Sequence, residues 1–143
     1  MINVKISISV GELCDRISIL IVKKSQIKDP IKLSNIDFQL QLAESELFSF
    51  LTVNEISTQI KDSITDNLTT LVRINKKLWD IEDSIRNCER CHNFGSEFIN
   101  LARMVYHTND DRHVIKRKID ELIGSGLSEE KEYTSYEKDI SIT

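Results

Sequence analysis

Apolar residues recur every three or four positions along most of this chain, which is the spacing of helices that bury one face. Four segments carry the pattern, over residues 10–28, 30–51, 55–91 and 96–123. One proline and four glycines interrupt it, and long stretches without either favour helices over a many-turned β fold. The pattern predicts one all-α domain over residues 1–123, built as an antiparallel bundle of about four helices.

Polar residues at the segment boundaries are typical of helix caps. Ser9 with Glu12 three positions later is a capping box, and Asp29 before Pro30 is an N-cap followed by proline at the first helical position. The remaining boundaries are assigned to Asn54 as the cap of the third helix, Ser96 as the cap of the fourth after Gly95, and Gly124 as a C-terminal cap.

The third segment changes character along its length. Residues 55–65 are rich in Ser and Thr, which are weak helix formers, whereas the apolar spacing becomes strong from Leu71 onward. A helix over 55–91 would be long against a mean of about 11–12 residues. One helix, or two helices separated near Asp66 and Asn67, both fit the pattern.

The apolar positions of the four segments define the expected core. Read at spacings of three and four, they form one stripe on each helix. The expected core residues are Leu13, Ile17, Leu20, Leu78, Ile81, Ile85, Leu101, Val105 and Ile119.

Both ends of the chain differ from the helical body. Residues 4–10 alternate apolar and polar positions, which predicts a short extended N-terminal segment with the pattern of a half-buried strand. Residues 124–143 carry five acidic and two basic residues, and we expect an acidic polar tail that is ordered at most in part. Residues 139–143 alternate again, which would allow a short pairing with the N-terminal segment.

Charge and hydropathy exclude several function classes. The chain has 143 residues and a formal net charge of -4, which argues against nucleic-acid binding because such proteins usually carry a basic face. No apolar run approaches the roughly 20 residues that span a bilayer, so we expect no membrane association. The first residues lack a basic region followed by a long apolar stretch, so we expect no secretory signal, a cytoplasmic location and three free thiols.

The motif Cys88-x-x-Cys91-His92 has the form of a c-type haem attachment site. Haem attachment requires export, and no export signal is expected here. Structural zinc requires four ligands, and the third cysteine and the other two histidines stand at no recognisable spacing. We therefore expect two free thiols near a helix end, with no metal and no cofactor.

A polar stripe on the third segment is more informative. Its members are spaced by four and three residues, so they share one helix face, about 100° from the apolar seam. Such side chains lie at the edge of the core, where each needs a polar partner. The stripe consists of Asn75, Trp79, Glu82, Arg86 and Glu89.

Similar polar flanks occur on two other segments. The first segment contributes Glu12, Asp15 and Arg16. The fourth segment contributes Arg103, Tyr106, Asn109, Asp110 and Arg112. If these helices pack together, charges of both signs converge at the edge of the bundle, and we expect one cluster centred on Arg86.

The expected cluster has two interpretations. As a binding site it would hold a small anionic or phosphorylated ligand, with hydrogen bonds donated by Arg16, Arg86, Arg103 or Arg112. As a structural feature it would be a set of ion pairs, such as Arg86 with the glutamates three and four residues away. Each such pair contributes about 0.3–0.5 kcal/mol when exposed.

An enzymatic alternative rests on the carboxylates. Glu12 and Asp15 form an E-x-x-D pair, and helical bundles hold divalent metals with such groups, as the all-α nucleotide pyrophosphohydrolases hold Mg²⁺. Those enzymes carry a denser acidic motif, and Arg86 among the acids suits ion pairing better. The alternative function is a metal-dependent hydrolase of a phosphorylated small molecule.

Blocks of the chain carry a family resemblance. They are residues 11–20 (GELCDRISIL), 78–89 (LWDIEDSIRNCE), 98–112 with FINLARMVY and NDDR, and 129–133 (EEKEY). With these blocks the chain resembles an uncharacterised bacterial family of small all-α proteins. The resemblance implies a domain of unknown function, with members associated with surface-glycan gene neighbourhoods, and it supplies no activity, cofactor or catalytic residue.

The sequence thus favours a non-catalytic binding or assembly module, linked through the resemblance to surface-glycan or nucleotide-sugar metabolism. Its partner would be another protein or a small anionic ligand, and a homo-oligomer is compatible with the pattern.

Overall fold

The computed structural model describes residues 2–124 and 134–136, and within these residues it is all-α. The helices are α1 (Val10–Gln26), α2 (Pro30–Val53), α3 (Thr58–Arg90) and α4 (Ser96–Ile123). The predicted all-α class with four helices is confirmed. The expectations for the tail at residues 125–133 and 137–143, including the fourth block of the resemblance, lie outside the described residues.

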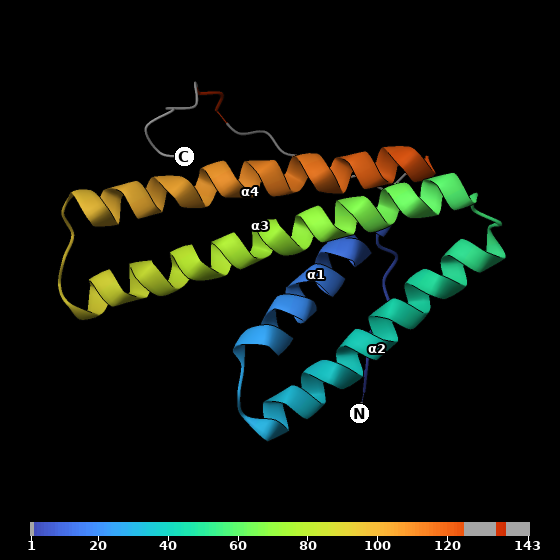
Figure 1. Cartoon of the computed structure of the whole chain (residues 1–143), viewed down its shortest axis with the longest axis horizontal. Helices are drawn as coiled ribbons and strands as arrows, with labels where there is room; N and C mark the ends of the chain where they lie inside the picture. The colour runs from blue at the N-terminus through green and yellow to red at the C-terminus, as the bar shows by residue number, and fades with distance from the viewer. Residues whose placement is uncertain (1, 125–133, 137–143) are drawn as a thin grey trace.

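The helices form two antiparallel pairs that cross at an angle (Figure 1). α3 and α4 lie side by side as a long hairpin, and the shorter pair of α1 and α2 leans against one half of it. α1 packs against each of the other three helices. The far half of the hairpin extends beyond α1 and α2. Because α1 contacts all three other helices, it organises the core although it is the shortest helix.

The core follows α1. One cluster joins Cys14 to Leu71 of α3 and Ile119 of α4, and a second joins Ile17 and Leu20 to the inner face of α2. Burial of a Leu or Ile side chain contributes about 1.5–3 kcal/mol. The first cluster therefore holds the two helix pairs together, and the second holds α2 against α1.

The predicted core is confirmed in part. The prediction is confirmed for Ile17, Leu20, Ile81 and Ile119, which are buried. The others are only partly buried: Leu13, Leu78, Ile85, Leu101 and Val105. Four of these five lie on the far half of the α3–α4 hairpin, where each helix has a single neighbour that covers only part of its apolar face.

Three predicted caps are confirmed. The Ser9 hydroxyl accepts a hydrogen bond from the Glu12 N–H, and the Asp29 carboxylate accepts from the first two N–H groups after Pro30. Gly124 closes α4 in the left-handed conformation with a φ of 72°.

Other boundaries differ from the prediction. Asn54 ends α2 rather than starting α3, and Ser57 is the N-cap of α3 because its hydroxyl accepts from the Ile60 N–H at 3.3 Å. Gly95 is the N-cap of α4, while Ser96 is already helical and makes no side-chain cap. These positions lie one to three residues from the predicted ones, which is the range over which neighbouring polar residues compete to cap a helix.

The third segment is one continuous helix of 33 residues without a break near 66–67. In its Ser/Thr-rich start, the side chains of Thr65, Asn67 and Thr69 donate to carbonyls four residues earlier. Local polar groups therefore bond within the helix, and packing against α1 and α4 outweighs their weak propensity.

The N-terminal strand pattern has no matching sheet. Among the described residues, no strand pairs with residues 4–9, and the side chains of Ile2, Val4 and Ile6 are 100%, 87% and 70% exposed. The extended prediction holds. The half-buried part is wrong for Val4 and Ile6, which are exposed, whereas Ile8 is half-buried and Val10 is buried as the first residue of α1. An alternating apolar and polar pattern indicates a segment that can form a β-strand, but the pattern does not provide a second strand for it to pair with.

Candidate functional site

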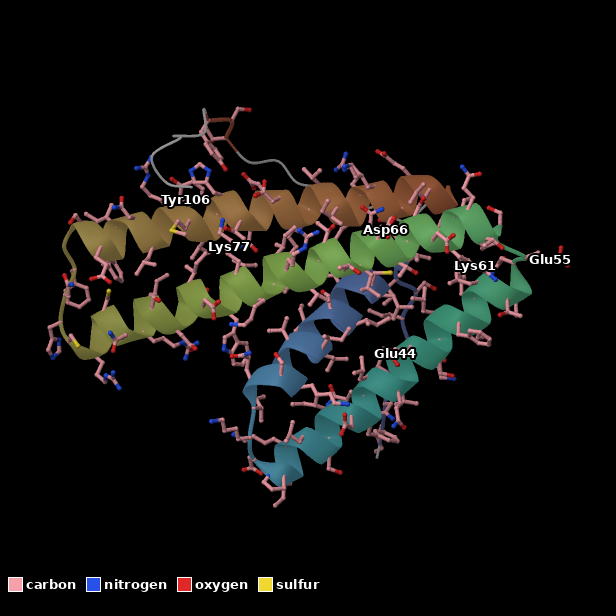
Figure 2. The ribbon with its side chains drawn as sticks, viewed as in Figure 1. Glu44, Glu55, Lys61, Asp66, Lys77 and Tyr106 are labelled. Atoms are coloured by element: carbon pink, nitrogen blue, oxygen red, sulfur yellow. The ribbon has the colours of Figure 1, made fainter. Side chains whose placement is uncertain are left out.

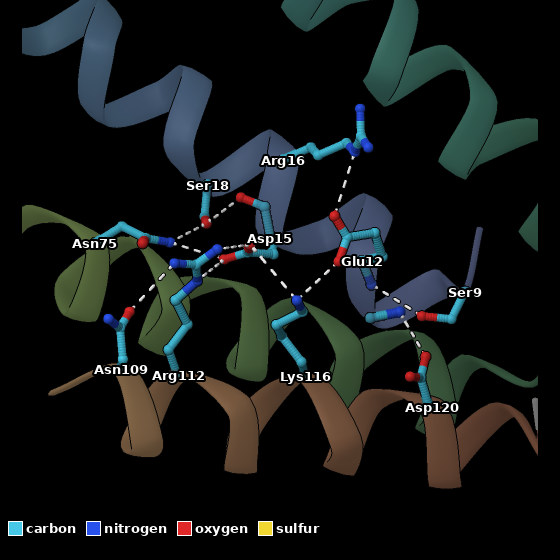
Figure 3. Close-up of polar contacts among 11 residues, drawn as sticks. Ser9, Glu12, Asp15, Arg16, Ser18, Asn75, Asn109, Arg112, Lys116 and Asp120 are labelled. Carbon is cyan, nitrogen blue, oxygen red and sulfur yellow. Dashed lines mark hydrogen bonds and ion pairs between the residues drawn. The ribbon is translucent and has the colours of Figure 1, made fainter. Parts of the chain in front are cut away.

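A buried polar cluster lies where α1, α3 and α4 meet, and Asp15 of α1 is its centre (Figure 3). We call it the Asp15 cluster, and its members are Glu12, Asp15, Ser18, Asn75, Asn109, Arg112 and Lys116. The Asp15 side chain is 1% exposed, so its charge depends on groups of the protein rather than on water.

Arg112 of α4 forms a two-point ion pair with Asp15. Its Nε donates to Oδ1 at 2.9 Å and its Nη2 donates to Oδ2 at 2.6 Å. The third nitrogen, Nη1, donates to the Asn109 side chain at 3.4 Å. A planar guanidinium matches a carboxylate at two points, and this geometry fixes the side chains more firmly than a single bond would.

Asn75 of α3 completes the contacts of Asp15. Its Nδ2 donates to Asp15 Oδ1 at 3.0 Å and to the Ser18 hydroxyl at 2.7 Å. The Ser18 hydroxyl in turn donates to the Asp15 backbone carbonyl at 2.6 Å. Since each buried polar group has a partner, the cluster ties α3 to α1 without leaving a buried donor or acceptor unsatisfied.

Lys116 of α4 adds a second cation. Its Nζ lies 2.7 Å from Glu12 Oε2 and 3.9 Å from Asp15 Oδ2. Glu12 also pairs with Arg16 at 3.4 Å, on the exposed rim of α1. Two carboxylates thus face two cations inside the cluster, and the charges balance where the helices meet.

A separate contact joins the beginning of α1 to the end of α4. The Gly11 N–H donates to Asp120 Oδ1 at 2.7 Å, and both residues are buried. A carboxylate at a helix N-terminus satisfies an N–H that has no partner within the helix. A Cβ at Gly11 would lie 2.3 Å from the Lys116 carbonyl oxygen, so only glycine permits this approach.

The prediction of a cluster between the first, third and fourth helices is confirmed, but its predicted centre at Arg86 is wrong. Arg86, Glu82 and Glu89 are exposed, and Trp79 is half-buried. α1 crosses α3 at Asn75, and Arg86 lies eleven residues further along α3, about 16 Å away at 1.5 Å per residue. The five residues of the predicted polar stripe share one face of α3, but α1 covers only Asn75.

The predicted residues of α4 divide in the same way. Arg112 and Asn109 join the cluster, whereas Asp110 accepts a hydrogen bond from Tyr136 on the outer side of the helix. That bond raises the pKa of Tyr136 to about 12. Tyr106 packs against Tyr136 there (Figure 2), and Arg103 is half-buried.

Two members of the cluster, and both residues of the separate contact between Gly11 and Asp120, were not among the predicted site residues. Ser18 lies one turn after Asp15, and Lys116 one turn after Arg112, so i,i+3 and i,i+4 spacing from predicted residues could have found both. Gly11 and Asp120 form a contact 109 residues apart in the chain, and no local signal predicts it.

The three cysteines are free thiols, and they occupy different environments. Burial raises the pKa of Cys14 to about 12, with the charges of Asp120 and Asp15 adding to the effect. Burial also raises the pKa of Cys88, while Cys91 is exposed. Within residues 2–124 and 134–136, no group of three or more His, Cys, Asp or Glu side chains is arranged as a metal site.

An open groove of about 440 Å³ lies between α3 and α4, away from the Asp15 cluster. Arg73, Lys76 and Lys77 supply cations on the α3 side, and Lys76 also pairs with Asp80 at 2.6 Å. Asp80 and Ser84 also line the groove, and its apolar side chains are Ile81 of α3 with Leu101 and Met104 of α4.

The outer face of α2 carries a row of exposed apolar side chains. We call it the α2 stripe, and it consists of Ile31, Phe38, Leu42 and Val53, which are 54 to 76% exposed. At 100° per residue they lie within about 60° of one another. The buried Ile36 and Leu40 lie on the opposite side of the same helix.

Comparisons with known proteins add no assignment: the chain matches no family model, no curated protein and no solved structure. In the part of the chain that the structure describes, no helix is long and apolar enough to cross a membrane.

Proposed function

We propose that this chain is a non-catalytic assembly module that binds another polypeptide through the α2 stripe. The observation that carries the proposal is that α2 has apolar side chains on two opposite faces. Its inner face packs on α1, and its outer face presents four large apolar side chains to solvent. A surface helix of a monomer normally carries charged or polar residues on its outer face.

The composition of the stripe supports an interface. Asn35 and Ser49, both uncharged and exposed, lie between its apolar members, and Ser45 and Glu46 lie at its two edges. Depletion of charge at the centre and enrichment in aromatic and aliphatic side chains distinguish interface cores from ordinary surface. An exposed apolar row of this kind typically marks a protein-binding surface.

The Asp15 cluster supports a structural role for the predicted polar site. Its carboxylates already accept from Arg112, Asn75 and Lys116, so a metal ion would have to displace these donors. The hydrolase alternative stays a prediction that gains no support from this geometry. The link to surface-glycan or nucleotide-sugar metabolism rests on the sequence resemblance alone.

One observation favours a second candidate function, the binding of a small anionic ligand. The groove between α3 and α4 places Arg73 and Lys77 beside apolar side chains, which suits a ligand with an anionic end and an apolar body. A thermal-shift screen with nucleotides and nucleotide sugars tests this candidate. A shift that Lys77→Glu abolishes would support it, and no shift with any of these compounds would contradict it.

Site-specific photo-crosslinking tests the assembly module. A photoreactive amino acid replaces Phe38 in the stripe, or Lys118 on the exposed face of α4 as a matched control. We expect the probe at position 38, in the native host cells, to crosslink to a polypeptide, and Leu42→Asp to remove that product. Crosslinking at position 38 no stronger than at position 118 would overturn the proposal.

A further inference from the structure

We propose that the polypeptide bound by the α2 stripe is a second copy of this chain. In this arrangement α2 packs antiparallel against α2 of the other copy, and a two-fold axis passes beside Leu42. The inference rests on the proposed function and specifies its partner. It follows from the symmetry, the charges and the area of the stripe.

The stripe is symmetric about Leu42. Ile31 precedes Leu42 by eleven residues and Val53 follows it by eleven, which is about three helical turns in each direction. Antiparallel pairing about Leu42 therefore places Ile31 over Val53 of the other copy, and Leu42 over its own counterpart. A two-fold interface requires this self-complementarity, because each patch meets the same patch reversed.

The same register places Phe38 at the level of Glu46 of the other copy, because Phe38 is four residues before Leu42 and Glu46 is four residues after it. At 100° per residue, Glu46 lies about 50° from the middle of the stripe, at its edge. The exposed Ser49 lies near the middle of the other copy's stripe and the exposed Ser45 at its opposite edge, and these small residues leave room there for the Phe38 ring. The carboxylate of Glu46 then belongs to the rim of the interface.

The charges along α2 favour the antiparallel orientation. Lys28 and Lys32 are exposed at the beginning of the helix. Asp29 lies between these two lysines. Glu46 at the edge of the stripe and Glu55 in the turn after the helix are exposed, and Figure 2 labels Glu55. Antiparallel pairing in this register brings Lys28 of each copy beside Glu55 of the other and also opposes the helix dipoles. Parallel pairing in register would bring each lysine to its own counterpart.

The available area matches an interface of modest size. The four apolar side chains of the stripe, which are 54 to 76% exposed, offer on the order of 500 Å² per copy. The polar positions around them add the rim. A standard interface buries about 800 Å² per partner, and one stripe together with its polar rim approaches that size.

The oligomeric state of the purified chain tests the proposal. At about 100 µM, sedimentation equilibrium should give twice the mass of one chain. Leu42→Glu should give the single-chain mass, with an unchanged helical circular-dichroism spectrum because the position is exposed. Ile99→Glu, at an equally exposed apolar position on α4, is the matched control and should remain dimeric.

Crosslinking through introduced cysteines tests the register, in a Cys91→Ser background that removes the exposed native thiol. With a short bis-maleimide, Leu42→Cys should crosslink to itself. Ile31→Cys and Val53→Cys should each crosslink weakly alone and strongly when the two variants are mixed. Strong crosslinking of Ile31→Cys alone would indicate a parallel pair and overturn the proposed arrangement.

The outcomes also separate this inference from the proposed function. A monomeric chain whose position 38 crosslinks to a different polypeptide overturns the second copy as partner and leaves the assembly module standing. A monomeric chain with no crosslink at position 38 overturns both. A dimer that Leu42→Glu does not dissociate overturns the α2 interface.

Discussion

The guanidinium of Arg112 donates two hydrogen bonds to the carboxylate of Asp15, although the two residues are 97 positions apart in the chain. Asp15 is 1% exposed and Arg112 is 24% exposed, so the pair lies at the inner edge of the contact between α1 and α4. Removing one partner of such a pair leaves the other charge in a place that water reaches poorly.

Arg112→Met should therefore destabilise the fold by about 3–5 kcal/mol, the loss expected when a buried charge loses its partner. Urea denaturation followed by circular dichroism measures the change. Arg86→Met is the matched control, because Arg86 is exposed on α3 and should change stability by less than about 0.5 kcal/mol. Equal losses for both variants would mean that the Asp15 cluster does not hold the helices together.

A double variant separates charge from packing in the same pair. Asp15→Leu combined with Arg112→Met should recover part of the stability lost in the single variant, because no unpaired charge remains buried. Chemical denaturation of all three proteins gives the interaction energy as a double-mutant cycle. Strictly additive losses would show that the two side chains contribute independently.

Gly11→Ala should destabilise the protein by about 1–3 kcal/mol, since the added methyl group would lie 2.3 Å from the Lys116 carbonyl oxygen and force α1 away from α4. Thermal unfolding measures the loss. Gly95→Ala is the matched control, because its nearest neighbour is an Asn93 side-chain atom at 3.4 Å. A Gly11→Ala protein as stable as Gly95→Ala would contradict the close approach.

Ile81→Ala should cost about 2–5 kcal/mol, because Ile81 is 4% exposed on α3. Ile99 on α4 is 54% exposed and serves as the control, for which Ile99→Ala should cost less than about 1 kcal/mol. Guanidinium denaturation distinguishes the two. A loss below about 0.5 kcal/mol for Ile81→Ala would show that this side of α3 is not buried.

The raised pKa of Cys14 predicts a loss of stability at alkaline pH. Burial raises the pKa of the folded thiol from 9.0 to about 12, so the folded state holds its proton more tightly than the unfolded state. The associated stabilisation is complete below pH 9.0 and is lost as the pH rises towards about 12. Cys14→Ala should therefore lose less stability than the unsubstituted protein between pH 9 and about 12, as measured by urea denaturation.

Thiol labelling provides an independent check of the same environment. In the native protein, Cys91 should react with a maleimide at neutral pH, while Cys14 and Cys88 react only after unfolding because both are buried. Intact mass after labelling counts the adducts. Three adducts on the native protein would contradict the burial.

Local features of this protein could be predicted from its sequence. Ser9, Asp29 and Gly124 cap helices where they were expected to, since a cap needs only a side chain or a backbone conformation within a few residues. The helical segments follow equally from apolar spacing, because one helix face must be buried whatever covers it. The same spacing placed Glu12, Asp15 and Asn75 at the edge of the core.

Only the tertiary structure decided which of those edge residues meet. α1 crosses α3 at Asn75 and stops short of Arg86, so one face of α3 is buried at one end and exposed at the other. The contact between Gly11 and Asp120, and the exposure of the outer face of α2, depend on where whole helices cross. Periodicity determines the direction of a side chain around its own helix, whereas the crossing points come from the packing of all four helices together.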